Sequence, residues 1–393
     1  MRLPSGNIDG DGTGGGRDSK RRWLWLAISA VGAVVSFFMN LYIDSVKRVV
    51  EWTWSRFAVQ WVLFSLIVFA CSYATWVVRG WTIARRMERR QIVEHTFPIR
   101  TEEFEDDVPI EEAIVGRRLR YLERVTESPV LVVCLHGLGL DANDFRRFMA
   151  AAREHTAAIT MFGFNTDEAK DARYRPIGLT THAHLLSRLI NELQQQYPRK
   201  KLVLIGFSLG ADMQLRLAEL WRERPDKQPN VAAMLLLDPN INHSTMVVSG
   251  GVAKLDGADP LTALKRIAEI PNTLVEFQNI CEYLHKITNK DLDQVKRFAS
   301  DMVAYWEPEG HFELFLQRIG DLQRVSPRVK VLFSANYEDH FGDIIGIARQ
   351  RRINREIFAV EEVDHFDLLE ENLLRREVAA LTGVRYPRLK LGA

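Results

Sequence analysis

The feature that most constrains this chain is a strand-like segment that runs into a glycine-flanked serine and then into a helical pattern. Four apolar residues, 202–205, are typical of a strand buried on both faces. They lead into Gly206-Phe207-Ser208-Leu209-Gly210, after which Met213, Leu217 and Leu220 recur at helical spacing. Strand, abrupt turn and helix form the context that a nucleophile elbow needs, since a side chain at either glycine would clash in so sharp a reversal.

This motif has a less specific interpretation. The pattern Gly-x-Ser-x-Gly occurs by chance in roughly one chain in ten of this length. Ser208 would then only cap the helix that follows it. The surrounding strand and helix favour the first interpretation, in which the new helix also offers the unpaired N–H of Leu209 to a developing oxyanion.

Composition excludes several classes of function. The net charge of the 393 residues is +1 and no long run of like charge occurs, so a nucleic-acid partner is not expected. The three cysteines, Cys71, Cys134 and Cys281, are scattered and odd in number. They indicate neither a disulfide framework nor a zinc site and fit a reducing compartment, so we expect no metal and no cofactor.

The first 80 residues have the pattern of a membrane anchor. Residues 1–22 are rich in Gly and Asp and are predicted to be a disordered tail. Residues 23–43 and 57–78 contain no charge, and each run is long enough to cross a bilayer core of about 30 Å. Seven of the nine tryptophans lie within the first 81 residues, near the ends of these runs, as in membrane-interface belts. Two transmembrane helices are therefore predicted within 23–80.

The flanking charges predict the orientation of this hairpin. Lys and Arg cluster at 17–22 and again at 79–90, whereas 44–56 carries few of them. A multi-pass membrane protein with a cytoplasmic catalytic domain follows from the positive-inside tendency. A cleaved signal peptide at the first run is the alternative, although the run is long for one. Residues 81–108, basic and helix-compatible at first and then acidic, are predicted to be a juxtamembrane linker.

Residues 109–393 alternate strand and helix signals. Strands are expected at 119–124, 130–135, 157–162, 202–205, 231–237, 329–333 and 356–360, and helices at 143–153, 181–197, 209–220 and 366–381. This alternation predicts an α/β fold with a mostly parallel sheet covered on both faces. The interval 239–328 breaks it, because its patterns at 262–270, 275–287, 292–306 and 311–322 are all helical. We expect a helical cap there, over the edge of the sheet where such folds bind ligands.

Two glycine-containing loops and a late histidine resemble the α/β-hydrolase superfamily. His136-Gly137-Leu138-Gly139 follows one predicted strand, the Ser208 motif follows another, and His365 lies after the last strand. The resemblance covers about residues 110–385 and implies the chain order Ser, acid, His. It assigns Ser208 as the nucleophile, His365 as the base, and the N–H groups of Leu138 and Leu209 as the oxyanion hole.

The acid that would orient His365 is not fixed by the sequence. The family's usual acid follows the strand 329–333 by a few residues, which favours Asp339. Glu338 is adjacent, and Asp238, directly after the preceding strand, occupies a position that some family members use. His136 is expected to be a structural hydrogen-bonding residue rather than a proton shuttle.

These inferences predict a membrane-anchored serine hydrolase that cleaves carboxylic esters through an acyl-enzyme. The predicted tether at a bilayer makes lipid or acylglycerol esters the leading acyl substrate. A thioesterase, acyltransferase or peptidase of the same fold is equally compatible with the motifs, and a non-catalytic, membrane-tethered binding scaffold is the alternative outside enzymes. The oligomeric state is left open.

Overall fold

The computed structural model describes residues 31–38, 64, 67, 71, 73, 75, 92–99, 117–165, 175–254, 281, 283, 285–287, 290–306 and 312–383. The chain divides into two compact units, Met1–Thr82 and Ile83–Ala393. The predicted tail at 1–22 lies outside the described residues.

The first unit corrects the predicted location of the protein. Its residues 31–38 are helical, as are the separately described residues 64, 67, 71, 73 and 75. None of the helices among the described residues combines the length and the apolar character that a membrane crossing requires. The prediction of a multi-pass membrane protein is therefore overturned. It relied on the uncharged runs 23–43 and 57–78. Most residues of both runs lie outside the described part of the chain.

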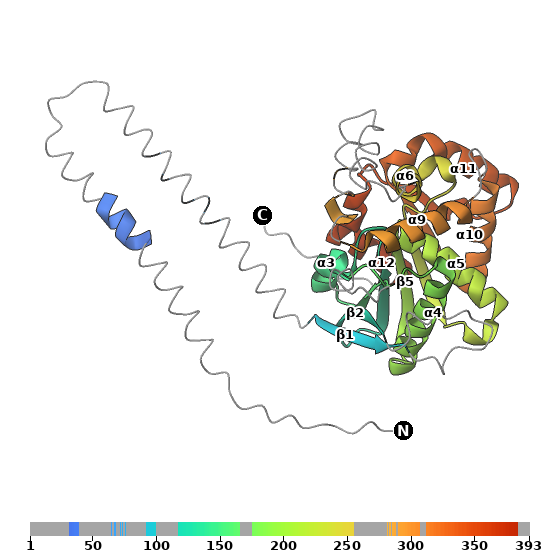
Figure 1. Ribbon diagram of the computed structural model, residues 1–393, viewed down its shortest axis with the longest axis horizontal. Coiled ribbons are helices and arrows are strands. Elements are labelled where there is room, and N and C mark those ends of the chain that lie inside the picture. The colour runs from blue at the N-terminus through green and yellow to red at the C-terminus, as the bar shows by residue number, and fades with distance from the viewer. Residues whose placement is uncertain are drawn as a thin grey trace. The chain divides into compact units, whose positions relative to one another are not determined.

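The second unit is built on an eight-stranded sheet in the order β1-β2-β4-β3-β5-β6-β7-β8 (Figure 1). The strands are β1 (Val93–Pro98), β2 (Arg118–Arg124), β3 (Val130–Leu135), β4 (His155–Thr160), β5 (Lys201–Phe207), β6 (Val231–Leu237), β7 (Val329–Phe333) and β8 (Phe358–Val360). Pairing is parallel from β4 through β3 to β8 and antiparallel at β1–β2 and β2–β4. The predicted mostly parallel sheet is confirmed.

One strand lies where the sequence predicted a linker. β1, within the predicted linker 81–108, pairs in register with β2 from Val93↔Glu123 to Pro98↔Arg118. It is the outermost strand, where a final proline that cannot donate to a ladder is tolerated. The basic residues before it favoured a helix, but the sheet edge supplies partners that override that local preference.

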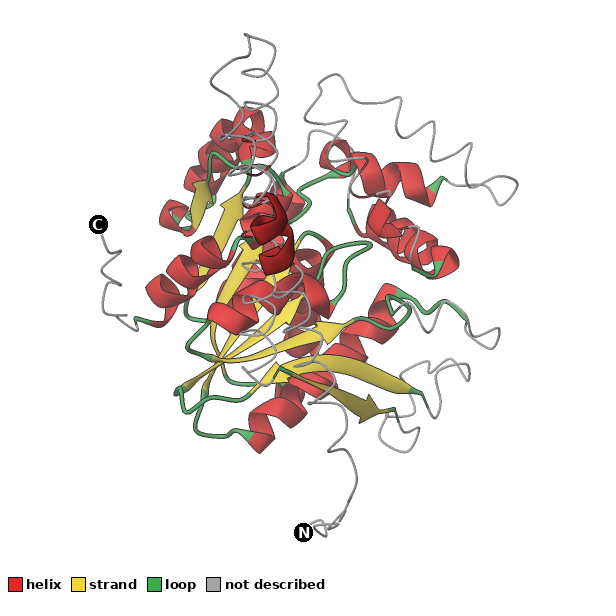
Figure 2. Ribbon diagram, turned by 90° about the vertical axis from the view of Figure 1, so that its left-hand side faces the viewer, coloured by secondary structure: helices red, strands yellow, loops and turns green. Residues whose placement is uncertain are grey.

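Helices cover both faces of the sheet (Figure 2). They are α3 (Arg146–Ala151), α4 (Leu179–Gln196), α5 (Leu209–Glu223), α6 (Val247–Ala253), α9 (Leu292–Tyr305), α10 (Glu313–Val325), α11 (Glu338–Gln350) and α12 (Glu371–Thr382). Leu202 and Leu204 of β5 pack in the core that contains α4, α5 and α10. Val203 and Ile205 point to the other face, where they pack with α3 and α12. The continuous apolar run of β5 is thus explained by burial on both faces.

The interval 239–328 is helical in its described residues, which include α6, α9 and α10. α10 packs on α5, where Arg318 Nε donates to Glu219 Oε1 at 2.9 Å, so it covers the sheet rather than the active edge. α9 is fixed to the first residue of α4, because Asp301 Oδ2 accepts from the N–H of Leu179 at 2.8 Å. The predicted helix at 262–270 lies outside the described residues.

The sheet determines where the functional residues meet. β3, β5, β6, β7 and β8 run in the same direction, so their carboxyl ends lie at one edge. The residues that follow these strands, His136 to Gly139, Ser208, Asp238, Ser334 and the segment to His365, are therefore brought to that edge.

Candidate active site

Ser208 forms the turn between β5 and α5. Its backbone adopts φ 51° and ψ −118°, a conformation that residues other than glycine rarely hold. The Ser208 N–H donates to the carbonyl of Leu237 at 2.8 Å, which ties the turn to the end of β6. The hydroxyl makes no capping hydrogen bond to α5, so the interpretation of Ser208 as a simple helix cap is wrong.

The two flanking glycines are required by contacts between backbones. A Cβ on Gly206 would lie 2.3 Å from the carbonyl oxygen of Gly210. A Cβ on Gly210 would lie 2.1 Å from the carbonyl oxygen of Leu135, at the end of β3. No backbone adjustment of the surrounding strands relieves contacts this short without separating β5 from its neighbours, so the tight turn depends on both glycines.

His365 and a buried carboxylate form a hydrogen-bonded pair. His365 Nδ1 lies 2.7 Å from Asp238 Oδ2; the side chain of His365 is 13% exposed and that of Asp238 is fully buried. Because a carboxylate only accepts, Nδ1 carries the proton and donates. The other ring nitrogen, Nε2, is left as an acceptor that faces the serine side of the edge.

The carboxylate that contacts His365 is therefore Asp238 and not Asp339. Asp339 and Glu338 lie in the first turn of α11 and are exposed. β6 and β7 are neighbours in the sheet, so acids after either strand reach the same edge and the sequence alone could not separate them. Asp238 follows its strand at once, whereas Asp339 is six residues beyond Phe333 and already inside a helix.

The loop that carries Asp238 is held from three sides. Asp238 Oδ1 accepts from the N–H of Ser334 at 2.5 Å, after β7. Asp212 of α5 accepts from the N–H and the side-chain amide of Asn240 at 3.1 and 2.5 Å. The Tyr337 hydroxyl donates to the carbonyl of Pro239 at 3.0 Å. Burial raises the pKa of both the Asp212 carboxyl and the Tyr337 phenol. The carboxylate beside His365 is thus fixed in one orientation.

A residue that the sequence did not single out, Tyr283, lies between the serine and the histidine. Its hydroxyl is 2.5 Å from His365 Nε2 and 3.4 Å from Ser208 Oγ. The first contact is a short hydrogen bond, and the second is longer than a good O–H···O bond. The phenol ring packs against Phe366 with centroids 4.7 Å apart and is 8% exposed. No pattern around a tyrosine in a helical insertion distinguishes it from a core residue.

The predicted oxyanion donors, Leu138 and Leu209, lie in two loops that touch. A Cβ on Gly137 would be 3.2 Å from Ser208 Cβ, so the loop after β3 passes directly against the serine. Neither the Leu138 N–H nor the Leu209 N–H donates to another described residue. Both leucines are almost fully buried. The arrangement leaves two backbone donors available beside Ser208.

His136 stabilises this loop and takes no proton from the site. Its Nε2 accepts from the N–H of Met161 at 2.9 Å, and its Nδ1 donates to the carbonyl of Gly137 at 2.8 Å. Both ring nitrogens are used, which requires the neutral ring. Burial lowers the pKa of His136 to about 4, so the ring stays neutral at physiological pH. The structural role predicted for His136 is confirmed.

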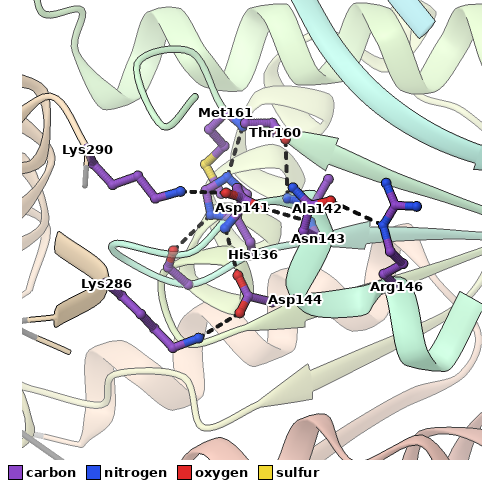
Figure 3. A network of polar contacts seen from close by, with 11 residues as sticks. His136, Asp141, Ala142, Asn143, Asp144, Arg146, Thr160, Met161, Lys286 and Lys290 are labelled. Carbon is purple, nitrogen blue, oxygen red and sulfur yellow. Dashed lines mark hydrogen bonds and ion pairs between the residues drawn. The ribbon is translucent and has the colours of Figure 1, made fainter. Parts of the chain in front are cut away.

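A network of charges joins the loop after β3 to the segment that carries Tyr283 (Figure 3). Asp141 and Asp144 form a reciprocal cap at the start of the short helix 142–145. Lys286 Nζ lies 2.7 Å from Asp144 Oδ1, and Lys290 Nζ lies 2.5 Å from Asp141 Oδ2. Burial raises the pKa of Asp141, but the hydrogen bond and charge of Lys290 outweigh it, and the net pKa is lowered. Both acids thus act as anions that hold a lysine.

Among the described residues, no three His, Cys, Asp or Glu side chains gather as a metal site would require. Cys134 is buried in β3, while Cys71 and Cys281 are exposed, and all three are free thiols.

A mostly parallel sheet covered on both faces, with a strained serine at a strand–helix turn, defines this unit as an α/β protein. Residues 132–377, more than half of the chain, match the model of the Alpha/beta hydrolase family. The chain belongs to that family. No curated protein sequence matches it.

Solved structures resemble this chain at low sequence identity. An AqdC variant bound to the Pseudomonas quinolone signal is 15% identical, with a TM-score of 0.50, over 74% of this chain and 100% of that one. A membrane phospholipase A described as a bacterial virulence factor is 14% identical, with a TM-score of 0.46, over 84% and 98%. A thermophilic esterase from Thermogutta terrifontis is 17% identical, with a TM-score of 0.47, over 74% and 99%. At these identities the likeness is one of fold.

Proposed function

We propose that this protein is a serine hydrolase that cleaves carboxylic esters through an acyl-enzyme. Ser208 is the nucleophile, His365 the general base and acid, and Asp238 the carboxylate that orients His365. The observation that carries the proposal is the line of polar atoms from Asp238 to His365 and, by way of the Tyr283 hydroxyl, to the strained Ser208, within one rim of the sheet.

The first half of the reaction forms the acyl-enzyme. Ser208 Oγ attacks the acyl carbonyl while its proton passes to His365 Nε2, because an unassisted hydroxyl is a poor nucleophile at neutral pH. The carbonyl oxygen becomes an anion that the N–H groups of Leu138 and Leu209 stabilise. His365 then gives its proton to the departing alkoxide, and the C–O bond to the alcohol breaks. Water repeats the sequence to release the acid.

Asp238 acts through the imidazole rather than on the substrate. It accepts from Nδ1, which keeps Nε2 unprotonated before the attack, and it stabilises the positive ring that forms during it. Ser334 fixes the second carboxylate oxygen, so Asp238 has one orientation toward His365.

The substrate class is argued from this chemistry alone. The preference for lipid or acylglycerol esters depended on the predicted bilayer location and has no support in the site itself, so we propose carboxylic esters of short to medium acyl chains. Thioesters and amides would react through the same acyl-enzyme. Only turnover measurements distinguish them from esters as substrates.

The test is a panel of p-nitrophenyl esters of graded chain length, with one thioester and one aminoacyl p-nitroanilide beside them. We expect ester turnover that falls at least a thousandfold in Ser208→Ala and in His365→Ala. Ser128→Ala is the matched control, because Ser128 precedes β3 and so lies at the amino end of that strand. Turnover that persists in Ser208→Ala contradicts the proposal.

A second candidate function is ligand binding without catalysis, and the position of Tyr283 favours it. The phenol hydroxyl uses the imidazole acceptor that catalysis needs. A scaffold of this kind shows no turnover and no covalent labelling of Ser208 even after Tyr283 is replaced.

A further inference from the structure

The hydrogen bond between Tyr283 and His365 has a defined direction. Nδ1 of His365 donates to Asp238, so in the neutral imidazole, which is the form that can act as a base, Nε2 carries a lone pair and no proton. The Tyr283 hydroxyl, 2.5 Å away, must therefore donate to Nε2. The lone pair that takes the proton of Ser208 during catalysis is already used, and the serine at 3.4 Å reaches only the phenol oxygen.

The phenol oxygen occupies a chemically defined place. In ester cleavage, the leaving oxygen is bonded to the carbon that Ser208 Oγ attacks, and it receives its proton from His365 Nε2. It must therefore lie beside Nε2 and close to Oγ. The Tyr283 hydroxyl meets both conditions in the resting protein. The alcohol of a substrate, or the water of the second step, has to take this place.

Four described residues between positions 283 and 290 contact the edge of the sheet that carries Ser208 and His365. Tyr283, Lys286 and Ile287 are helical and spaced i, i+3 and i+4, which places them on one helix face, and Lys290 follows in a bend. Ile287 is fully buried and fills the space beside Gly139, where an added Cβ would lie 2.8 Å from its Cγ1.

The two lysines are the polar part of this contact. Lys286 and Lys290 pair with acids of the loop after β3, as Figure 3 shows. Lys290 is 7% exposed, so its pair with Asp141 is shielded from solvent. Lys286 also lies over the ring of Phe366, next to His365, at 5.5 Å from the centroid. Lys286, Ile287 and Lys290, which all follow Tyr283 in the sequence, thus hold the phenol in place.

We propose that Tyr283 is a built-in inhibitory group that holds the leaving-group position, and that Lys286 and Lys290 keep it there until substrate displaces it. The inference rests on the proposed hydrolase function of Ser208. It specifies a resting state in which the Tyr283 hydroxyl occupies Nε2 of His365, the nitrogen that would accept the proton of Ser208.

A proton relay through Tyr283 is the opposite assignment, and the geometry disfavours it. A relay needs two short hydrogen bonds in series, but the Ser208–Tyr283 contact at 3.4 Å is too long for efficient transfer. The phenol also stands where the leaving group must depart. The two assignments predict opposite effects of removing the hydroxyl.

The experiment compares the rate of p-nitrophenyl acetate hydrolysis and the rate of labelling by a small fluorophosphonate in the full-length chain. Tyr283→Phe removes the hydrogen bond and keeps the ring, so we expect both rates to rise about fivefold, the factor that one neutral hydrogen bond supplies. Tyr283→Ala also removes the ring, so we expect both rates to rise further in that variant. Tyr121→Phe, on β2, is the matched control and leaves both rates unchanged.

The lysines are tested separately. Lys286→Ala combined with Lys290→Ala removes the ion pairs without touching the acids that cap helix 142–145, and we expect a three- to tenfold rise, about the size of one shielded and one partly exposed ion pair. Lys330→Ala breaks a comparable pair with Glu377 elsewhere and leaves the rates unchanged. Circular dichroism confirms that each variant is folded.

The outcomes separate the two proposals. A fall of tenfold or more in Tyr283→Phe makes Tyr283 a relay and overturns the inhibitory role while the hydrolase function stands. Rates in Tyr283→Phe and Tyr283→Ala within twofold of the unmodified protein also overturn it, again with the hydrolase function intact. An absence of labelling and turnover in every folded variant overturns the hydrolase function itself and the inhibitory role with it.

Discussion

Replacement of the buried carboxylate, Asp238→Asn, is the sharpest test of the site because the structure fixes how the new amide must sit. Asp238 Oδ1 accepts from the N–H of Ser334, so the amide oxygen takes that position. The amide nitrogen then replaces Oδ2, 2.7 Å from His365 Nδ1. Two donors cannot face each other there, so the imidazole shifts its proton from Nδ1 to Nε2.

This tautomer cannot act as a base toward Ser208, because the nitrogen that faces the serine already carries a proton. The analogous change of the orienting carboxylate in serine proteases lowers kcat by about 10⁴ through the same inversion. That factor corresponds to about 5.5 kcal/mol of activation free energy. We expect a loss of about 10³–10⁴ in kcat here, with little change in KM.

The assay is steady-state hydrolysis of a p-nitrophenyl ester by folded protein, with Asp339→Asn as the matched control. Asp339 is exposed on α11, so its replacement should change kcat by less than twofold. A large loss in Asp339→Asn together with near-normal turnover in Asp238→Asn refutes the reasoning. The orienting carboxylate would then be Asp339, which follows β7.

Three further predictions concern the folded state. Gly210→Ala should abolish cooperative thermal unfolding, because its Cβ would lie 2.1 Å from the Leu135 carbonyl oxygen. Gly320 in α10 has open space around it, so Gly320→Ala should stabilise the fold by about 0.5–1 kcal/mol. His136 has a folded-state pKa of about 4 and an unfolded value near 6.5, so the unfolded chain takes up its proton first on acidification. Its contribution is present above pH 6.5, and urea denaturation should show a loss of about 3 kcal/mol between pH 6.5 and 4 that is absent in His136→Asn. Burial also raises the pKa of the Cys134 thiol, so native protein should resist alkylation at Cys134 until it is unfolded, and rapid native alkylation there would contradict the buried core.

The sheet was predictable because its strands are short and doubly buried. Short apolar runs bounded by turn residues, such as 231–237 and 329–333, are typical of buried strands. They match β6 and β7, respectively. β1 was not predictable, because an edge strand with one exposed face has weak periodicity and depends on its partner. The membrane prediction rested mainly on lack of charge, which shows only that a run can be buried in apolar surroundings.

The candidate site was predictable where chain order decides it. Ser208 and His365 each follow a strand whose neighbours are fixed, so both reach one edge. The choice between Asp238 and Asp339 depended on the direction of side chains after adjacent parallel strands, which residue spacing does not encode. Tyr283 depended on how an insertion folds back on the sheet, a long-range contact with no local signal.

The central claim is that Ser208 is activated by His365 at the rim of this sheet, and mass mapping of a fluorophosphonate adduct tests it most directly. We predict a single adduct on the peptide that contains Ser208, absent in Ser208→Ala and formed at least a thousandfold more slowly in His365→Ala. An adduct on another residue, or one that forms at the normal rate in folded His365→Ala, would contradict the account.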